Sequence, residues 1–317
     1  MSLEVETVLE RRRLRKQIGL WRGVAIVVGV VALLAFAAIQ AGKTGLIGNQ
    51  QIARIKIEGL ITDDTKRLQM LRKLAKAEHV RGVVVYVDSP GGTTTGGEGL
   101  YEALRELAEK KPVVAQFGTV AASAAYIVGL ATDHIVARGN TITGSVGVIV
   151  QWPEVSGLLE KLGVKFNQVK SGTLKAEPNA FEPPSPEAIA VTREMIEDGQ
   201  KWFNSLVSDR RKIDVASVPG LTEGRIYSGR MALSLKLIDE IGAQDEAIDW
   251  MVKNRDVQKG LPIVDWKPTG DLQWPFGGQA VSLWSFLTGA APISTTQNPF
   301  ATLGLDGMLS VWQPQEK

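Results

Sequence analysis

A run of β-branched and aromatic residues that ends in a glycine turn constrains the fold of this chain more than any other feature. Residues 83–87 read Val-Val-Val-Tyr-Val, and residues 88–92 follow as Asp-Ser-Pro-Gly-Gly. A run without polar alternation is typical of a strand buried on both faces of a parallel sheet. The two glycines allow the backbone to direct N–H groups into a cleft at the carboxyl end of this strand. The sequence therefore predicts an α/β sheet whose edge carries a turn lined with donors.

Strands and helices alternate around this run. The pattern predicts a strand at 52–57, an amphipathic helix at 64–78, a helix at 97–110 and a strand at 113–117. This order favours a parallel sheet with right-handed crossover helices. Further along the chain we expect a helix at 124–130, strands at 135–137 and 146–150, and helices at 154–162 and 186–212.

Two polar side chains are candidates for nucleophilic chemistry. Ser123 follows the strand at 113–117 and opens the helix at 124–130, which places it at a strand-to-helix turn. Ala-Ser-Ala also occurs in buried helices, so this turn alone does not define a site. Lys175 ends the stretch Val-Lys-Ser-Gly-Thr-Leu-Lys at 169–175. A lysine can serve as the general base for a serine if desolvation lowers its pKa by several units from about 10.4.

Several ordered motifs together resemble one family, the signal peptide peptidase A or protease IV family of membrane-bound bacterial serine peptidases, in its short single-copy form. They are Ser-Pro-Gly-Gly at 89–92, Val-Ala-Ala-Ser at 120–123, Thr-Gly-Ser-Val-Gly-Val at 143–148, Lys-Ser-Gly at 170–172 with Lys175, and Gly-Arg-Ile-Tyr-Ser-Gly at 224–229. The resemblance implies the fold shared by Clp protease and the crotonases. It also implies a Ser/Lys dyad of Ser123 and Lys175, with Lys170, Ser171 and Gly172 beside it in structural or substrate-binding roles.

One departure from the family pattern adjoins the nucleophile. The family usually has two glycines after its serine, whereas this chain has Ala124 and Ala125 before Tyr126. Two methyl groups narrow the backbone freedom after Ser123. The shape of the pocket is therefore expected to differ from the family pattern.

Backbone N–H groups are the expected oxyanion hole. The candidates are Gly91 or Gly92 together with Ser123 or Ala124. Ser145 is expected beside the dyad as a hydrogen-bonding neighbour, because position 143 is threonine and the Gly-x-Ser-x-Gly pattern is absent. A substrate peptide is expected to add as an extended strand beside residues 91–94 and 145–148.

Other catalytic classes fit the sequence less well. The two histidines, His79 and His134, leave a Ser-His-Asp triad through His134 as the chemical alternative. A zinc site is weaker still, because the chain has no cysteine and the histidines form no helical pair. No metal and no cofactor are expected.

The amino-terminal region predicts a membrane anchor. Five basic residues between positions 11 and 16 precede an apolar run at 23–39, and with its flanks this run approaches the ~20 residues that cross a bilayer. The run exceeds the ~7 to 15 residues of a signal-peptide core, which favours retention over cleavage. The basic residues predict a cytoplasmic amino terminus in a bacterial inner membrane, with the catalytic domain on the extracytoplasmic side. A net charge of +2 gives no indication of a nucleic-acid partner.

These observations predict five segments. They are a cytoplasmic tail at 1–17, a transmembrane helix at 18–42, a linker at 43–50, a peptidase domain at 51–268 and a C-terminal extension at 269–317. The extension is rich in proline and tryptophan, and we expect it to pack on the domain or on a neighbouring subunit, with membrane-surface contact as the alternative. No internal repeat is visible.

The resemblance implies hydrolysis of signal peptide remnants and other short hydrophobic peptides near the bilayer, by a ring-like homo-oligomer. The serine and the lysine of one site can then come from a single subunit or from neighbouring subunits, and the sequence leaves both arrangements open. Two other functions remain open on the same fold. One is a crotonase-type acyl-thioester enzyme, which would bind coenzyme A, and the other is a non-catalytic membrane scaffold.

Overall fold

The computed structural model describes residues 17–36, residues 50–268 and the backbone of 309–311. The chain divides into two compact units, at 1–50 and at 51–317. In the first unit the described part is one helix, Gln17–Phe36, which is long and apolar enough to cross a membrane. A signal sequence near an amino terminus has the same properties. Residues 37–42 of the predicted span, and most of the C-terminal extension, lie outside the described residues.

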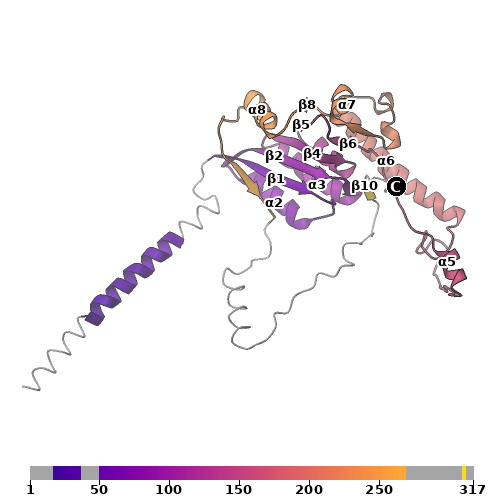
Figure 1. The fold of residues 1–317 in the computed structure, drawn as a ribbon, viewed down its shortest axis with the longest axis horizontal. Coiled ribbons are helices and arrows are strands. Elements are labelled where there is room, and N and C mark those ends of the chain that lie inside the picture. Colours follow the sequence, from indigo (N-terminus) through magenta and orange to yellow (C-terminus); the bar gives the residue numbers. More distant parts are fainter. Residues whose placement is uncertain (1–16, 37–49, 269–308, 312–317) are drawn as a thin grey trace, which may run out of the picture. The chain divides into compact units, whose positions relative to one another are not determined.

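The second unit is built on one eight-stranded sheet with helices on both faces (Figure 1). Its strands are β1 (Gln51–Glu58), β2 (Val80–Ser89), β4 (Val113–Ala122), β5 (His134–Ala137), β6 (Ile142–Gly144), β7 (Ile226–Ser228), β8 (Glu240–Ile241) and β9 (Ile263–Trp266), and a separate pair is formed by β3 (Gly91–Thr93) and β10 (Leu309–Val311). The α-helices are α2 (Thr65–Lys76), α3 (Thr94–Ala108), α4 (Ala124–Leu130), α5 (Ser156–Lys161), α6 (Pro186–Arg211), α7 (Gly229–Ser234) and α8 (Gln244–Asn254). Two short 3₁₀ helices lie at Val215–Ser217 and Leu221–Glu223.

The sheet is parallel except where β6 pairs with β7. Along the path β7-β6-β4-β2-β1-β9, strand β4 pairs with β2 on one side and forks on the other. Residues 114–117 of β4 pair with β5, and residues 120–122 pair with β6. The fork opens at the carboxyl end of β4, and parallel sheets place ligand sites at such ends.

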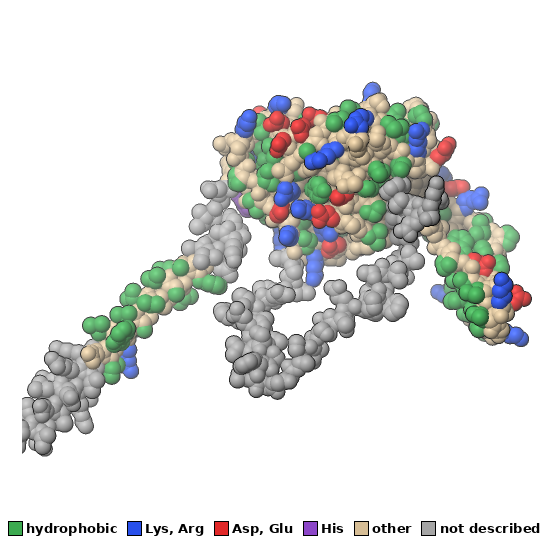
Figure 2. Space-filling model, in the orientation of Figure 1, with side chains coloured by type: hydrophobic (Ala, Val, Ile, Leu, Met, Phe, Trp, Pro, Cys, Tyr) green, Lys and Arg blue, Asp and Glu red, His purple; other side chains and the backbone are tan. Residues whose placement is uncertain are grey.

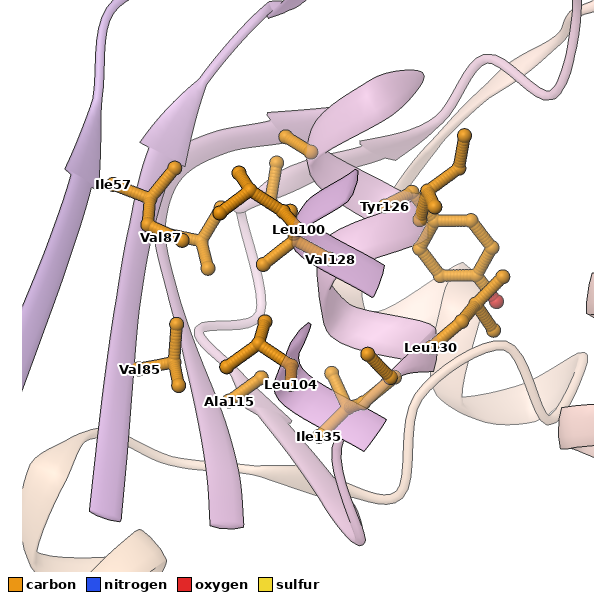
Figure 3. Close-up of a cluster of buried hydrophobic side chains, with 14 of the residues drawn as sticks. Ile57, Val85, Val87, Leu100, Leu104, Ala115, Tyr126, Val128, Leu130 and Ile135 are labelled. Carbon is orange, nitrogen blue, oxygen red and sulfur yellow. The ribbon is translucent and has the colours of Figure 1, made fainter. Parts of the chain in front are cut away.

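Two apolar cores cover the two faces of the sheet. On one face, α2, α3 and α4 pack on strand residues such as Val85, Val87 and Ala115 (Figure 3). On the other face, α8 places Ala247 and Met251 against a smaller cluster of strand residues. Because both faces are covered, the four valines of the run at 83–87 are all fully buried, as the run predicts.

Most predicted elements are confirmed, with three differences. The strand predicted at 113–117 continues to Ala122, five residues beyond its predicted end. The helix predicted at 154–162 is the shorter α5. The strand predicted at 146–150 is wrong, since only residue 149 makes an isolated bridge there. The Ser145 N–H donates instead to the Arg225 carbonyl, which holds this segment as a loop.

Candidate active site

Ser123 occupies a strained turn between β4 and α4. Its φ is 58° and its ψ is −122°, outside the regions that non-glycine residues normally adopt. Its N–H donates to the Gly144 carbonyl at 2.9 Å, and the side chain lies in the core with 1% of its surface exposed. Backbone strain of this kind costs on the order of 1–3 kcal/mol and clusters at functional sites. A strained serine at a strand-to-helix turn is also the geometry of a nucleophile elbow.

The two alanines after Ser123 fit the core without distortion. Ala124 and Ala125 are fully buried at the start of α4. A methyl group placed on Gly97 of α3 would lie 3.2 Å from the Ala124 side chain, so the missing side chain at position 97 makes room for Ala124. Helical backbone here needs no glycine, and the departure from the family pattern is a packing difference between α3 and α4.

Tyr126 anchors the first turn of α4. Its hydroxyl donates to the Leu237 carbonyl at 2.8 Å, and its ring meets Phe117 edge to face at 6.4 Å. Burial raises the pKa of Tyr126 well above its ordinary value, so the hydroxyl remains a neutral donor. This contact fixes α4, and therefore the Ser123 turn, against the segment that follows α7.

In the glycine turn after β2, some backbone groups are hydrogen-bonded to the chain on one side and others face the opposite edge of β3. Gly91 has a φ of 115°, which favours glycine, and its N–H donates to the Ser89 hydroxyl at 3.0 Å. A methyl group on Gly92 would lie 1.8 Å from the Ile61 carbonyl oxygen. The Ile61 N–H donates to the Gly91 carbonyl, and the Thr93 N–H donates to the Ile61 carbonyl. Backbone groups alternate along a strand, so the N–H and C=O of Gly92 face the opposite edge of β3.

A segment of the chain itself lies along that opposite edge. Strand β10 pairs with β3 in antiparallel register, with Ser310 opposite Gly92 and Val311 opposite Gly91. This edge of the Ser-Pro-Gly-Gly turn therefore accepts an extended backbone, which is the geometry predicted for a substrate.

Ser145 lies next to the Ser123 turn. Gly144 pairs with Ala122 across β6 and β4, so the residues that follow each of them, Ser145 and Ser123, leave the sheet side by side. Ser145 is half-buried, with a φ of 52°. Ser145 therefore lies beside Ser123, and its role as a hydrogen-bonding neighbour of the dyad stays a prediction.

Lys175 lies on a segment that projects from the sheet. Residues 151–185 carry α5 and extend beyond α6 (Figure 1), away from the body that holds Ser123. Lys175 is exposed, and its N–H donates to the Gly172 carbonyl at 3.1 Å. Among the described residues none covers this amine, because the projecting segment extends away from the body that holds Ser123.

Lys170, the other lysine of the motif, is held by two carboxylates. Its ammonium donates to Glu177 and, at 2.7 Å, to Glu182. These hydrogen bonds raise the pKa of Lys170, and the bond from Lys170 lowers the pKa of Glu182 to about 2. An amine that is held protonated cannot accept a proton from a serine. The sequence analysis predicts no role for either glutamate, although both follow the Lys-Ser-Gly turn closely.

The histidines lie at the other end of the sheet. His134 aligns with Val114 at the start of β4, stacks on Trp250 at 4.7 Å and hydrogen-bonds Glu240 at 3.1 Å. Ser123 follows nine residues after Val114, so at ~3.3 Å per residue about 30 Å of strand separates the two ends. Within one chain His134 therefore cannot be the base of Ser123. His79 stacks on Trp266 near the start of β2.

The fold is that of a Clp protease-like domain with a strained serine at the carboxyl end of a strand, and comparison with known proteins supports this. A family model for Clp protease matches residues 49–139, and a model for peptidase family S49 matches residues 105–258. A putative signal peptide peptidase SppA of Enterococcus faecium is 31% identical over 75% of this chain and 74% of its own length. A putative protease of Synechocystis is 36% identical over 63% of this chain and 73% of its own.

The chain therefore belongs to peptidase family S49, and it is a serine peptidase that acts on peptides. The protease 4 of Haemophilus influenzae is 31% identical over 63% of this chain, which covers 34% of that longer protein. The family assignment favours peptide hydrolysis over acyl-thioester chemistry and over a scaffold without activity.

Proposed function

We propose that this protein is a membrane-anchored serine endopeptidase that hydrolyses signal peptide remnants and other short hydrophobic peptides. The observation that carries the proposal is the strained Ser123 turn beside a strand edge that accepts an extended backbone. The substrate class follows the printed names of relatives, such as the Enterococcus signal peptide peptidase.

The chemistry requires a serine, a neutral amine and two oxyanion donors. The Lys175 amine takes the proton of the Ser123 hydroxyl as its oxygen attacks the scissile carbonyl. The resulting ammonium then protonates the leaving nitrogen as the C–N bond of the peptide breaks, and the acyl chain stays on Ser123 as an ester. Water, deprotonated by the same amine, hydrolyses the ester and restores the serine.

The oxyanion donors in this proposal are the N–H groups of Gly92 and Ala124. Ser89 accepts from the Gly91 N–H, and Gly144 accepts from the Ser123 N–H, so these two candidates are already engaged. The Gly92 N–H faces the edge along which β10 lies, and in this proposal the substrate takes the place of β10 there. The Ala124 N–H belongs to the first turn of α4, where a helix leaves donors without intrahelical partners. Each donor to an oxyanion contributes about 2.7–4 kcal/mol to transition-state stabilisation in comparable enzymes.

Lys175 comes from a neighbouring subunit in this proposal. The projecting segment exposes a set of large apolar side chains that a second copy of the chain would cover (Figure 2). They are Leu158, Leu162, Val164, Phe166, Val169, Leu174 and Phe181. A head-to-tail contact that closes into a ring would let each such segment bring its lysine to the Ser123 of the next subunit. Burial in that contact would supply the desolvation that the amine needs.

The helix Gln17–Phe36 provides the anchor. Its 20 residues span about 30 Å at 1.5 Å per residue, which matches the hydrocarbon core of a bilayer. The basic residues before it favour a cytoplasmic amino terminus, and the peptidase domain then lies on the extracytoplasmic side of the inner membrane. An anchor of this kind keeps the site near the lipid, where apolar peptides accumulate.

A mixing experiment tests the dyad and its origin together. Ser123→Ala and Lys175→Met are purified separately, then co-assembled by mild dissociation and dilution, and assayed with a fluorogenic peptide. We expect each variant alone to be inactive and the equimolar mixture to recover activity, because about a quarter of head-to-tail interfaces would pair an intact serine with an intact lysine.

Two results would contradict the proposal. Activity in either variant alone would remove that residue from the dyad. Two inactive variants with no recovery in mixed oligomers, verified by mass, would refute a site shared between subunits.

A further inference from the structure

The projecting segment contains a cluster of bonded polar side chains, and its members flank the candidate base in the sequence. We propose that Lys170 is a positioning residue, which ties the turn bearing Lys175 to the stretch that follows it through Glu177 and Glu182. The inference rests on the proposed function, since it concerns the base of the same site. It assigns an intramolecular role to the first lysine of the motif, instead of contact with the peptide.

The cluster closes a short loop. Lys170 and Glu177 are joined by a salt bridge, and Lys175 lies between them in the sequence. Within the loop the Lys175 N–H donates to Gly172, and the Glu177 N–H donates to Leu174 at 3.3 Å. The Lys170–Glu177 ion pair therefore holds together the two ends of a loop whose interior is already hydrogen-bonded. Loss of the pair would leave the Lys175 backbone fixed at one end only.

Burial distinguishes this cluster from an ordinary surface pair. The Glu177 side chain is 6% exposed and the Lys170 side chain 18% exposed, although the neighbouring Thr173 and Lys175 are exposed. The second carboxylate oxygen of Glu177 is buried without a hydrogen-bond partner among the described residues. A buried carboxylate with so few partners depends on its remaining ones, so removal of the lysine is costly.

Two further contacts extend the cluster across the segment. The Asn179 amide donates to both Glu177 and Glu182 at 3.0 Å, and it accepts from the Phe181 N–H at 2.8 Å. The Phe181 ring stacks on Phe166 at 4.4 Å. The chain before the turn and the chain after it are thus joined by the stacked phenylalanines and by the two salt bridges of Lys170, with Lys175 on the loop between them.

The test compares Lys170→Met with Lys170→Arg in the full chain. Lys165→Met on the same segment is the matched control. We expect Lys170→Met to lower kcat roughly tenfold to a hundredfold with little change in KM, because misplacement by about 1 Å costs up to that much. Arginine should restore most of the rate, since a guanidinium bridges two carboxylates as well as an ammonium does. The control should match the unaltered protein.

The pH profile separates positioning from simple loss of structure. A loosely held amine is more hydrated, and hydration favours its protonated form. The acidic limb of kcat/KM should therefore move to higher pH in Lys170→Met. A loss of folded protein would lower the rate equally at every pH. Active-site titration with a serine-directed phosphonate counts the competent sites in each sample.

Several outcomes decide the inference. An unchanged kcat and an unchanged acidic limb in an assembled Lys170→Met oligomer would overturn it. If that variant fails to assemble, Glu182→Gln, which keeps the Glu177 pair, should show a smaller loss and a smaller shift, and a normal profile there would overturn the inference. A KM effect alone would assign Lys170 to substrate binding instead. Activity in Lys175→Met would refute the proposed base itself, independently of Lys170.

Discussion

Gly92 shows how a single residue fixes the geometry of the candidate site. Its α-carbon lies so close to Ile61 that no side chain fits, and this contact turns the N–H and C=O of Gly92 toward the edge occupied by β10. Ser123 contributes a second backbone feature, its positive φ. The core around Ser123 and the hydrogen bond from its N–H to the Gly144 carbonyl maintain this conformation. Both features are backbone properties, which side-chain chemistry alone does not reveal.

Gly92→Ala tests this close approach. A methyl group 1.8 Å from the Ile61 carbonyl forces the glycine turn to shift, so we expect hydrolysis to be lost and the unfolding temperature to fall. The matched control is Gly99→Ala in α3, where the new methyl meets only Leu68 at 3.7 Å. That variant should keep its activity and gain about 0.5–1 kcal/mol of stability. Thermal unfolding measures the stability of the two variants, and a peptide assay measures their hydrolysis. Normal hydrolysis by Gly92→Ala would contradict the expectation.

Strand β4 shows why element boundaries need tertiary contacts. The sequence after Phe117 contains Gly118 and Thr119 and resembles a turn, yet the strand continues to Ala122. The Asp88 carboxylate accepts the N–H groups of Thr119 and Val120 at 3.1 and 3.0 Å, where the register with β2 shifts. The Asp88 side chain thus replaces the missing backbone partners, and β4 continues as a strand up to the residue before Ser123.

The pairing of β10 with β3 predicts competition with substrate. Ser310→Pro removes a backbone N–H from β10 and should weaken the pairing. Because an extended substrate would use the same edge, we expect a KM for peptides lower by a few fold and little change in kcat. Ser310→Thr keeps the N–H and is the control. An unchanged KM in a correctly folded Ser310→Pro protein would show that β10 and substrate do not compete.

At the scale of the whole molecule, the candidate site residues lie on two parts, a buried sheet end and an exposed projecting segment. The sheet carries Ser123 and the glycine turn, and residues 151–185 carry Lys175 with the apolar side chains beside it. Large exposed apolar surface of this kind marks an interaction site. If Ser123 and Lys175 form the proposed dyad, a monomer would lack a complete one.

Val169→Glu tests the division. Val169 is fully exposed in one chain, so a charge there should leave the fold intact while it disrupts a contact between copies. We expect a smaller oligomer by light scattering and a parallel loss of hydrolysis. Lys161→Glu adds an acid to the same segment without removing apolar surface, and it should assemble normally. An active monomeric Val169→Glu protein would contradict the shared site.

The sequence by itself determined the α/β class, the order of most elements and the serine turn, because hydrophobic periodicity and glycine placement are local properties that burial imposes directly. The motifs added the family and with it the candidate lysine. Only the tertiary structure decided which backbone N–H groups of the candidate site are hydrogen-bonded within the chain, where β4 ends and how Lys170 is engaged. These three features depend on contacts with Gly144, Asp88 and Glu177. Each of these residues is either distant in the sequence from its partner or belongs to no motif that predicts the contact. It also placed Lys175 on a projecting segment, since the direction of a segment follows from packing that no local pattern records.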